Sequence, residues 1–584
     1  MGGIAGVLCW GGQPDAEERA IAPDGSSFGG EGLYVAARAR STLARSERFV
    51  VAVAGRFDRS PATGQSAAET LLERWTAEGP DALAHFEGAW VAAVFERGSR
   101  RLHLLRDPFG VRRLYYAHKD GRLAFATTVK PLLKLPWVSR EIARENLAEY
   151  LSFRYVHAPR TLLRDVRALP PGHHLVYDGD VRLKPWFSLV YSPPYAPLPE
   201  DGATLEDLER RINRSVAARA SGRERVGVLL SGGLDSSAIA LYASRLGPVH
   251  TFTVGVTDAE GDETPYAGRV ANLLRTRHEV LRVDFPQYEE AFHTVVGGSD
   301  TPVTDPACIP QYLLARHARQ FVDVILAGDG GDEVFGGRMA GLLAREVRVS
   351  TAMQRLPSPI VSGLAMWLGD RRPELRDPAT PFGLARLIGG VHVFDAPGRL
   401  ELLRDPGWVR SGVRRLCLEP MYREVVSDPV NEILHAYLRG RMVEDALLRS
   451  GTAASLAGIG LRAPMLDRDL VAFCARLPGP WKVRTTPSGV ITKWPLREIL
   501  RPRLGRALVS RPKRVLPGPW RRWFAGPARA FLAERVALLE EDPARLFLPG
   551  ALRSLAQNPD VPGNDAKLWT LLFFDAWRRE MGAG

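Results

Sequence analysis

The stretch that most constrains the fold of this chain runs from Val226 to Ser237 and reads VGVLLSGGLDSS. An apolar run with β-branched residues ends abruptly at Ser-Gly-Gly, and helix-compatible residues follow at once. The pattern predicts a strand, a tight loop and a helix. Backbone N–H groups then gather at a helix N-terminus, where the partial positive charge of the helix favours a phosphate group.

The side chains of this loop predict a nucleotide-phosphate site. Gly232 and Gly233 let the main chain approach an anion closely. Three hydroxyls can donate to that anion: Ser231, Ser236 and Ser237. Asp235 implies a Mg²⁺ ion between itself and the phosphate, because two anions repel each other. The spacing differs from G-x-x-x-x-G-K-[ST], which argues against a kinase or GTPase-type loop.

The motif SGGLDSS resembles the pyrophosphate-binding loop of the asparagine synthetase family and its relatives. The resemblance implies that ATP and a carboxylic acid give an acyl-adenylate, that pyrophosphate leaves on Mg²⁺, and that an amine then attacks. It also implies four positions that hold the adenosine part of ATP, partly through backbone atoms: Leu230, Val254, Ala327 and Gly328.

A second glycine-rich loop, AGDGGDEVFGG from Ala327 to Gly337, follows an apolar strand. In a parallel sheet its carboxylates, Asp329 and Asp332, lie where Asp235 also points, because ligands bind at the carboxyl ends of such strands. The family resemblance implies that Asp332 is the second Mg²⁺-pyrophosphate contact. It also implies that Asp329 lies close to the arriving amine.

Lys493, in ITKWPLREIL, aligns with the family lysine that stabilises charge on the adenylated intermediate and on the departing pyrophosphate or AMP. A fixed cation in a partly dry site stabilises a transition state electrostatically. Only eight of the 78 basic residues are Lys, so lysine is not the default basic residue of this chain. This imbalance favours a functional Lys493 over a solvated surface lysine.

The net charge of +12 and the pI of about 9.7 raise the question of a nucleic-acid partner. No RNA- or DNA-binding motif accompanies the charge, so we expect none. A basic cleft for ATP or for an acidic or peptide substrate remains open.

The first 187 residues predict short strands separated by turns. Six strands are expected at residues 4–9, 49–54, 89–95, 101–106, 114–118 and 122–127, with helices at 67–78 and 142–151. The pattern indicates an antiparallel α+β arrangement. The stretches MGGIAGVL, RDPFGVRRLYYA and LPPGHHLVYDG resemble the glutaminase domain of class II amidotransferases, which implies an Ntn-hydrolase-like sandwich.

This segment departs from the glutaminase family where hydrolysis needs particular side chains. The family has a cysteine after the initiator Met, which acts as nucleophile with its own α-amino group as base, and here that position is Gly2. The glutamine-holding motif Asn-Gly-Glu appears as Ala54, Gly55 and Arg56. Cys9 lies near the end of an apolar strand without a free amine, which indicates a buried structural role. We expect a retained scaffold without glutaminase activity.

Two domains and a linker are expected. Residues 1–187 form the glutaminase-like domain, residues 188–202 a Pro-rich linker, and residues 203–584 the ATP-binding domain. In the second domain, after a helix at 204–220, strands at 250–256, 279–284 and 322–327 alternate with helices at 264–274 and 309–319. Residues 338–440 show Arg-rich helical patterns without a chemical motif, and we assign them to a helical cap.

The expected fold class is an α+β Ntn-hydrolase-like sandwich followed by an α/β doubly wound parallel sheet of the adenine nucleotide α-hydrolase type, with a helical C-terminal part. The four cysteines lack C-x-x-C spacing, which fits a reducing cytosol and argues against disulfides or a zinc site. No signal-peptide pattern is visible, and the apolar-rich stretch Pro359 to Gly369 is too short to span a membrane. We expect a cytoplasmic protein without membrane contact.

The leading hypothesis is an ATP-dependent synthetase that adenylates a carboxylate and joins it to an amine without its own glutaminase activity. A lasso-peptide cyclase, or another natural-product amide former, fits this description. In such a cyclase a side-chain carboxylate of a precursor peptide is adenylated and the peptide's own N-terminal amine attacks, and a partner can deliver the precursor. Asp329 would then position or deprotonate the amine.

The acceptor side also departs from the family. Asparagine synthetases usually have Asp-Arg where this chain has Gly451-Thr452, and Glu-Ala-Arg where it has Gly460-Leu461-Arg462. The missing glutamate also belongs to the catalytic dyad of β-lactam synthetases, so the expected acceptor pocket differs from both groups.

Two alternatives stay open. One is asparagine synthesis from free or partner-supplied ammonia, which Gly460 disfavours because an aspartate pocket needs partners for the α-amino and α-carboxyl groups. The other is a non-catalytic binding protein on the same scaffold, which both phosphate loops and Lys493 disfavour. The sequence does not specify the acid, the amine or the oligomeric state.

Overall fold

A computed structural model describes residues 3–10, 13–21, 26–38, 41–58, 64–193, 196–222, 224–257, 262–337, 393–408, 427–487, 489–511, 518–542 and 544–583. The chain divides into two compact units, which are described separately. The first comprises Met1–Ala143, Val156–Ser188 and Arg578–Gly584, and the second comprises Arg144–Tyr155 and Leu189–Trp577.

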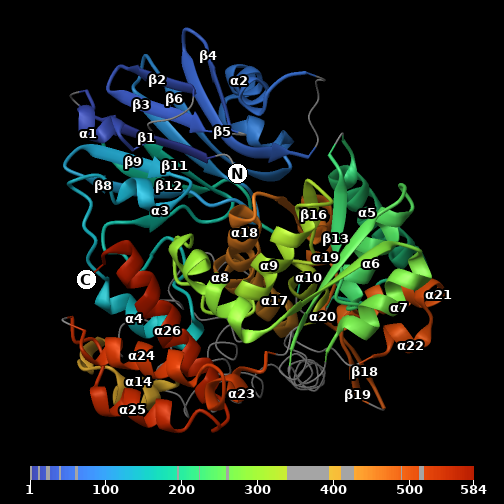
Figure 1. Ribbon diagram of the computed structural model, residues 1–584. Coiled ribbons are helices and arrows are strands. Elements are labelled where there is room, and N and C mark those ends of the chain that lie inside the picture. Colours follow the sequence, from blue (N-terminus) through green and yellow to red (C-terminus); the bar gives the residue numbers. More distant parts are fainter. Residues whose placement is uncertain are drawn as a thin grey trace, which may run out of the picture. The chain divides into compact units, whose positions relative to one another are not determined.

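Two six-stranded antiparallel sheets form the first unit (Figure 1). The first sheet has the order β10 (Arg167–Ala168), β8 (Tyr115–Lys119), β9 (Arg122–Ala126), β1 (Gly3–Cys9), β3 (Leu33–Arg38) and β2 (Ser26–Gly30). The second has the order β12 (Val181–Pro185), β11 (His173–Tyr177), β7 (Arg101–Arg106), β6 (Gly88–Glu96), β5 (Phe49–Phe57) and β4 (Thr42–Arg45). The helical elements are α1 (Ala16–Arg19), α2 (Ala67–Glu78), η1 (Gly79–His85) and α3 (Val129–Leu132).

Strand β5 shows why these residues form layers. Val50 and Ala52 belong to the core that both sheets share, whereas Val51 and Val53 pack on the opposite face with Trp75 of α2. A strand covered on both faces reads as a continuous apolar run instead of an alternating one. The first unit is therefore a sandwich of two sheets with α2 on the outer face of one of them, as the α+β pattern predicted.

A buried histidine pair joins two strands of the second sheet. Nδ1 of His103 on β7 and Nε2 of His174 on β11 lie 2.7 Å apart, and the rings stack with centroids 5.0 Å apart. Burial is the largest cause that lowers the pKa of His103 to about 3 and that of His174 to about 4. The positive charges of Arg101 and Lys184 lower these pKa values further.

We expect the first unit to lose stability as the pH falls below about 6.5. The unfolded chain takes up protons on both histidines there, whereas the folded unit resists protonation, so each histidine costs up to about 1.4 kcal/mol per pH unit in this window. Calorimetric unfolding from about pH 7.5 to about pH 4.5 should therefore decline more steeply for wild type than for the double variant His103→Leu/His174→Leu. Parallel pH dependences of the two proteins would contradict this assignment.

A five-stranded parallel sheet organises the second unit. Its order is β15 (Arg277–Val283), β14 (His250–Val256), β13 (Val226–Leu229), β16 (Val324–Leu326) and β17 (Gly460–Arg462). Because β14 and β16 flank β13 on opposite sides, the chain changes direction across the sheet between β13 and β16. Ligands of such sheets bind beyond the carboxyl ends of the strands at this switch point.

Helices cover both faces of this sheet, so the expected α/β class is confirmed (Figure 1). The helices up to the second glycine-rich loop are α4 (Arg144–Phe153), α5 (Asp201–Ala220), α6 (Leu234–Ser244), α7 (Thr264–Leu274), α8 (Phe285–Gly297), α9 (Cys308–Ala318) and α10 (Gly331–Phe335). Then follow α14 (Ala396–Leu402), α17 (Pro429–Arg439), the π-helix η3 (Met442–Ala446), α18 (Leu447–Leu456), η4 (Pro464–Leu466), α19 (Arg468–Ala475) and α20 (Gly479–Lys482).

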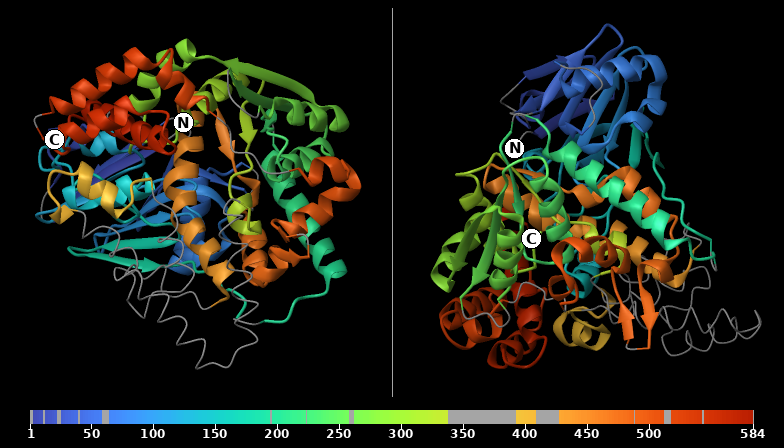
Figure 2. Two further views of the ribbon diagram at one scale, coloured as in Figure 1. Left: turned by 90° about the horizontal axis from the view of Figure 1, so that it is seen from below. Right: turned by 90° about the vertical axis from the view of Figure 1, so that its right-hand side faces the viewer.

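The remaining elements are the hairpin β18 (Arg484–Thr486) and β19 (Gly489–Ile491), and the helices α21 (Trp494–Leu504), α22 (Arg506–Val509), α23 (Trp520–Ala525), α24 (Arg529–Glu540), α25 (Pro549–Gln557) and α26 (Asn564–Met581). Helices α24, α25 and α26 lie together in every view (Figures 1 and 2). Aromatic contacts join this group to α8: the Phe292 ring lies 5.1 Å from Phe531 and 5.2 Å from Phe573. Such pairs add to the stabilisation from apolar burial, and they hold the helical C-terminal part on the sheet domain.

Two boundaries differ from the sequence-based expectation. Helix α4, expected in the first domain, belongs to the second unit, because the Tyr150 hydroxyl donates to the Thr570 carbonyl at 2.9 Å and its ring contacts Phe574. Helix α5 begins at Asp201, inside the expected linker, and Asp201 accepts a hydrogen bond of 3.0 Å from Trp481 Nε1.

The expected helical cap falls largely on residues 338–392 and 409–426, outside the described residues, as does the apolar-rich stretch Pro359 to Gly369. Its described parts include the helices α14 and α17. No helix in the described ranges is long and apolar enough to cross a membrane.

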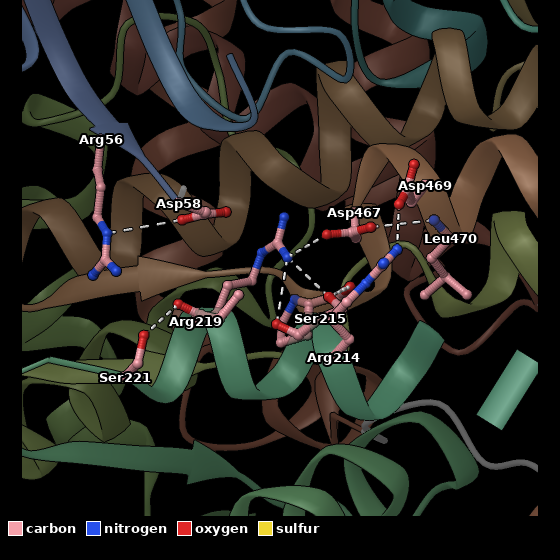
Figure 3. Close-up of polar contacts among 11 residues, drawn as sticks. Arg56, Asp58, Arg214, Ser215, Arg219, Ser221, Asp467, Asp469 and Leu470 are labelled. Carbon is pink, nitrogen blue, oxygen red and sulfur yellow. Dashed lines mark hydrogen bonds and ion pairs between the residues drawn. The ribbon is translucent and has the colours of Figure 1, made fainter. Parts of the chain in front are cut away.

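A buried ion pair fastens α5 to the segment that follows β17 (Figure 3). Nη1 of Arg219 lies 2.9 Å from Oδ2 of Asp467, and the side chains are only 5% and 2% exposed. Ser215, one turn earlier on α5, accepts a second bond from the same nitrogen at 2.8 Å. A neighbouring pair, Arg214 and Asp469, joins the same two segments at the surface.

Candidate active site

The predicted phosphate loop connects β13 to α6. Oγ of Ser231 lies 3.1 Å from Oγ of Ser236, and the Ser231 N–H donates to the same Ser236 oxygen at 3.2 Å. Gly233 precedes the helix, and no side chain caps it. The uncapped N–H groups of the first turn are therefore available to an anion. The hydrogen bonds between Ser231 and Ser236 hold the loop in this shape without a ligand.

Gly232 is required by the path of this loop. Its φ is +68°, a conformation that L side chains rarely adopt. A Cβ atom there would also lie 2.7 Å from the backbone carbon of Tyr266. Any other residue would push the loop away from the N-terminus of α7.

Most of the predicted site residues line one pocket of about 310 Å³. They are Leu230, Ser231, Gly232, Gly233, Asp235, Ser236, Val254, Ala327, Gly328, Asp329, Asp332 and Lys493. Ser237 is not among the described lining residues: it is buried inside α6, where its N–H donates to the Gly233 carbonyl at 2.9 Å. The pocket thus lies at the carboxyl ends of β13, β14 and β16.

Lys493 lies between the two loops. Its Nζ contacts Oδ2 of Asp235 and lies 2.6 Å from Oδ1 of Asp332, and the lysine side chain is 4% exposed. Burial acts to lower the pKa of Lys493, but the two carboxylates outweigh it and raise the pKa above the usual value. The ammonium is therefore charged throughout the neutral range.

The backbone of Lys493 is strained. Its φ and ψ are 52° and 38°, a left-handed conformation that is uncommon outside glycine and is found at functional sites. Gly337 makes room for the side chain, because a Cβ atom at Gly337 would lie 1.9 Å from Cε of Lys493. The fold therefore directs this ammonium to one position.

Several polar side chains of the pocket escaped the sequence reasoning, among them Gln311, Arg449, Arg497 and Arg511. Arg449 pairs with Asp305, and its Nε donates to Oε1 of Gln311 at 3.2 Å. Arg449 lies two residues before Gly451, so the altered family motif was a signal that could have led to it. Arg497 on α21 lies in ITKWPLREIL, the same family-like stretch as Lys493, which is the signal that could have marked it.

Arg511 contacts the phosphate loop directly. Its Nη2 lies 2.8 Å from Oε1 of Glu263 and donates to the Ser231 carbonyl at 3.3 Å. Its guanidinium carbon also lies 4.3 Å from the centre of the Tyr266 ring, close enough for a cation–π contact. Arg511 begins the stretch RPKRV that resembles the family, which is the signal that could have marked it.

Gly460 and Gly451, where the sequence departs from the family, are not among the described residues that line this pocket. Gly460 begins β17, where it pairs with Val324, and it is absent from the described lining. A Cβ atom there would lie 3.0 Å from Cγ2 of Val324. Gly451 likewise lies outside the lining, whereas its neighbour Ser450 is part of it. Arg449, Ser450 and Gln311 are among the residues that line the pocket.

The first unit holds the residues of the degenerate glutaminase motif. Ala54, Gly55 and Arg56 lie on β5, where Ala54 is fully buried and Arg56 points to Asp58, with Nε 3.9 Å from Oδ1 (Figure 3). The Cys9 thiol is 3.4 Å from Oε2 of Glu18, and burial is the largest cause that raises its pKa to about 12. Gly2 lies outside the described residues.

Residues 207–579 match the family model described as asparagine synthase. The chain belongs to this family. A second model, described as a glutamine amidotransferase domain, matches residues 56–187. Membership makes the chain an ATP-dependent, amide-forming ligase, as the family resemblance of the two glycine-rich loops implied.

Relatives of this family member are similar over most of its length. A putative glutamine-hydrolysing asparagine synthetase of Mycobacterium tuberculosis is 29% identical over 530 residues, which cover 87% of this chain and 79% of the relative. Asparagine synthetase 1 of Bacillus subtilis is 27% identical and covers 87% and 80%. Amidase chyE of Penicillium rubens is 24% identical and covers 80% and 74%.

Two solved structures align with parts of the chain. A glutamine phosphoribosylpyrophosphate amidotransferase of B. subtilis aligns with 48% of this asparagine synthase family member and 65% of its own chain, at 11% identity and a TM-score of 0.22. A nicotinamide mononucleotide (NMN) synthetase of Francisella tularensis aligns with 24% and 58%, at 19% identity and a TM-score of 0.18.

Proposed function

We propose that this asparagine synthase family member adenylates a carboxylate and joins it to an amine that does not come from its own glutamine hydrolysis. Macrocyclisation of a lasso peptide, or another amide-forming step in natural-product biosynthesis, is the activity that fits best. The observation that carries the proposal is the buried ammonium of Lys493 between Asp235 and Asp332, beside the phosphate loop. A scaffold used only for binding would have no need of this strained, precharged arrangement.

The reaction assigns roles to the residues around the pocket. A carboxylate oxygen attacks the α-phosphorus of ATP, the bond to the β-phosphate oxygen breaks, and pyrophosphate leaves. The nitrogen of the amine then attacks the acyl carbon and AMP leaves. Lys493 stabilises the negative charge that develops in both steps, and Asp329 accepts the proton of the attacking amine.

The nucleotide contacts follow from the same pocket. Ser231, Ser236 and the loop N–H groups would bind the phosphates, while Leu230, Val254, Ala327 and Gly328 would hold the adenosine part. Ser237 would act only by shaping α6, because its side chain lies within the helix.

The carboxylates fit a Mg²⁺ ion. Oδ1 of Asp235 is buried and has no hydrogen-bond partner among the described residues, and Asp332 supplies a second carboxylate. In the described ranges no group of three or more histidine, cysteine or acidic side chains gathers as a metal cage. This suits Mg²⁺, which binds one or two carboxylates together with substrate phosphates and, when bound, neutralises charge on the leaving pyrophosphate.

Several features support the absence of glutaminase activity. Gly2 offers no nucleophile, and the raised pKa of Cys9 keeps this thiol protonated. Arg56 stands where the family places an acid and points to Asp58. Cys9 therefore cannot replace the missing nucleophile, and Arg56 cannot replace the missing acidic side chain.

We expect labelled pyrophosphate to exchange into ATP when Mg²⁺ and a peptide carboxylate are present. We expect no exchange when L-aspartate is the only acid. Glutamine should remain unhydrolysed in the same mixture, and Cys9→Ala should change neither result. Exchange with aspartate would favour an ammonia-dependent asparagine synthetase. ATP binding without exchange on any acid would favour the non-catalytic alternative.

A further inference from the structure

One basic side chain of the pocket lacks an acidic partner. In the part of the chain that the structure describes, the basic side chains of the lining are Arg449, Lys493, Arg497 and Arg511. Three of them form ion pairs: Lys493 with Asp235 and Asp332, Arg449 with Asp305, and Arg511 with Glu263. Among the described residues no carboxylate pairs with Arg497.

Backbone carbonyls hold the guanidinium of Arg497 in place. Its Nε donates to the Thr492 carbonyl at 2.8 Å, and its Nη1 donates to the Val509 carbonyl of α22. Within the described ranges, these bonds leave the Nη2 donors and one Nη1 donor without a protein acceptor. Burial first, and the charge of Arg501 second, lower the pKa of Arg497, as expected for a cation that no neighbouring anion compensates.

Arg497 lies on the side of the pocket that is formed by the phosphate loop and Lys493. The Arg497 N–H donates to the carbonyl of Lys493, the residue before α21, at 3.1 Å, and both side chains line the pocket. Helix α21 packs against α6, the helix that follows the phosphate loop. Arg449, in contrast, bonds to Gln311 on α9.

We infer that Arg497 binds the β- and γ-phosphates of ATP, and then the leaving pyrophosphate, as a positioning and charge-stabilising group. A planar guanidinium held on one edge presents its free N–H groups to two phosphate oxygens in a fixed geometry. The inference rests on the ATP-binding part of the proposed function and goes beyond it, since it names the group that receives the leaving anion. It does not depend on which acid is adenylated.

Titration calorimetry with inorganic pyrophosphate, ATP and AMP, each with Mg²⁺, tests this inference. We expect Arg497→Gln to weaken pyrophosphate and ATP binding about ten- to a hundredfold, because charged hydrogen bonds are lost, and to leave AMP binding unchanged. Arg497→Lys should restore part of the loss. Arg501→Gln is the matched control: Arg501 lies on the same helix, pairs with Glu498 at 2.6 Å, has a 48% exposed side chain and should bind all three ligands as wild type does.

The outcomes separate this inference from the proposed function. If Arg497→Gln weakens AMP as much as pyrophosphate, or weakens neither, the phosphate role is wrong and Arg497 only ties α21 to α22. A rise in the KM for the acid with unchanged pyrophosphate binding would also overturn it. Wild-type protein that binds pyrophosphate through Arg497, yet supports no exchange with any acid, would refute the proposed function alone.

Discussion

Replacing Lys493 by Met should reduce exchange of pyrophosphate into ATP by at least about a hundredfold, the usual loss when one preorganised charge-stabilising donor is removed. The ammonium is buried beside Asp235 and Asp332, so the site would lose its cation and keep two facing carboxylates. Lys493→Arg should retain part of the activity, because it preserves the charge but not the compact shape of an ammonium. Initial exchange rates at saturating ATP and acid measure both effects.

A second buried lysine provides the control for folding. Lys482 on α20 is 2% exposed, its Nζ donates to the Cys474 carbonyl at 3.1 Å, and it does not line the described pocket. Lys482→Met therefore removes a buried ammonium without touching the pocket, and we expect it to retain exchange at temperatures where it is folded. Equal losses of exchange in the two variants would show that Lys493 acts through stability rather than through charge in the site.

The sheet domain could be predicted from the sequence because its signals are local and mutually consistent. The apolar run before Ser231 and the glycines after it specify a strand, a loop and a helix at consecutive positions. The same reasoning placed Asp235 and Asp332 together, since the carboxyl ends of parallel strands meet at one edge. The continuous apolar run of β5 was also found, whereas β2, Ser26–Gly30, was missed because its glycines and serines carry no strand pattern.

The rest of the site depends on contacts between segments that are distant in sequence. Arg497 lies in the same family-like stretch as Lys493, but that stretch does not say which of its side chains face the site, and the packing of α21 against α6 brings Arg497 to the pocket. Gly460 shows the same dependence on contacts between distant segments. A family motif names a position, but the pairing of β17 with β16 decides which way that position faces. Arg449, eleven residues earlier, lines the described pocket.

Replacing Arg219 by Met should lower the free energy of unfolding by about 3–5 kcal/mol, because removing one partner leaves a buried, uncompensated charge. The charge left behind is Asp467, whose side chain is 2% exposed and which also caps α19 through the Leu470 N–H at 3.2 Å. Loss of the pair would loosen α5 from the segment after β17, where the two are in contact. Urea denaturation measures the change.

The neighbouring surface pair is the control that shows whether burial causes the loss of stability expected for Arg219→Met. Arg214 and Asp469 join the same helix to the same segment, but their side chains are 51% and 40% exposed (Figure 3). Solvent screens such pairs, so Arg214→Met should cost at most about 1 kcal/mol. The double replacement Arg219→Met/Asp467→Leu should recover much of the stability, since it removes both buried charges and fills the space with apolar groups. If Arg214→Met were as destabilising as Arg219→Met, the exposed and the buried pair would contribute equally to stability. Burial of the Arg219–Asp467 pair would then not explain the loss.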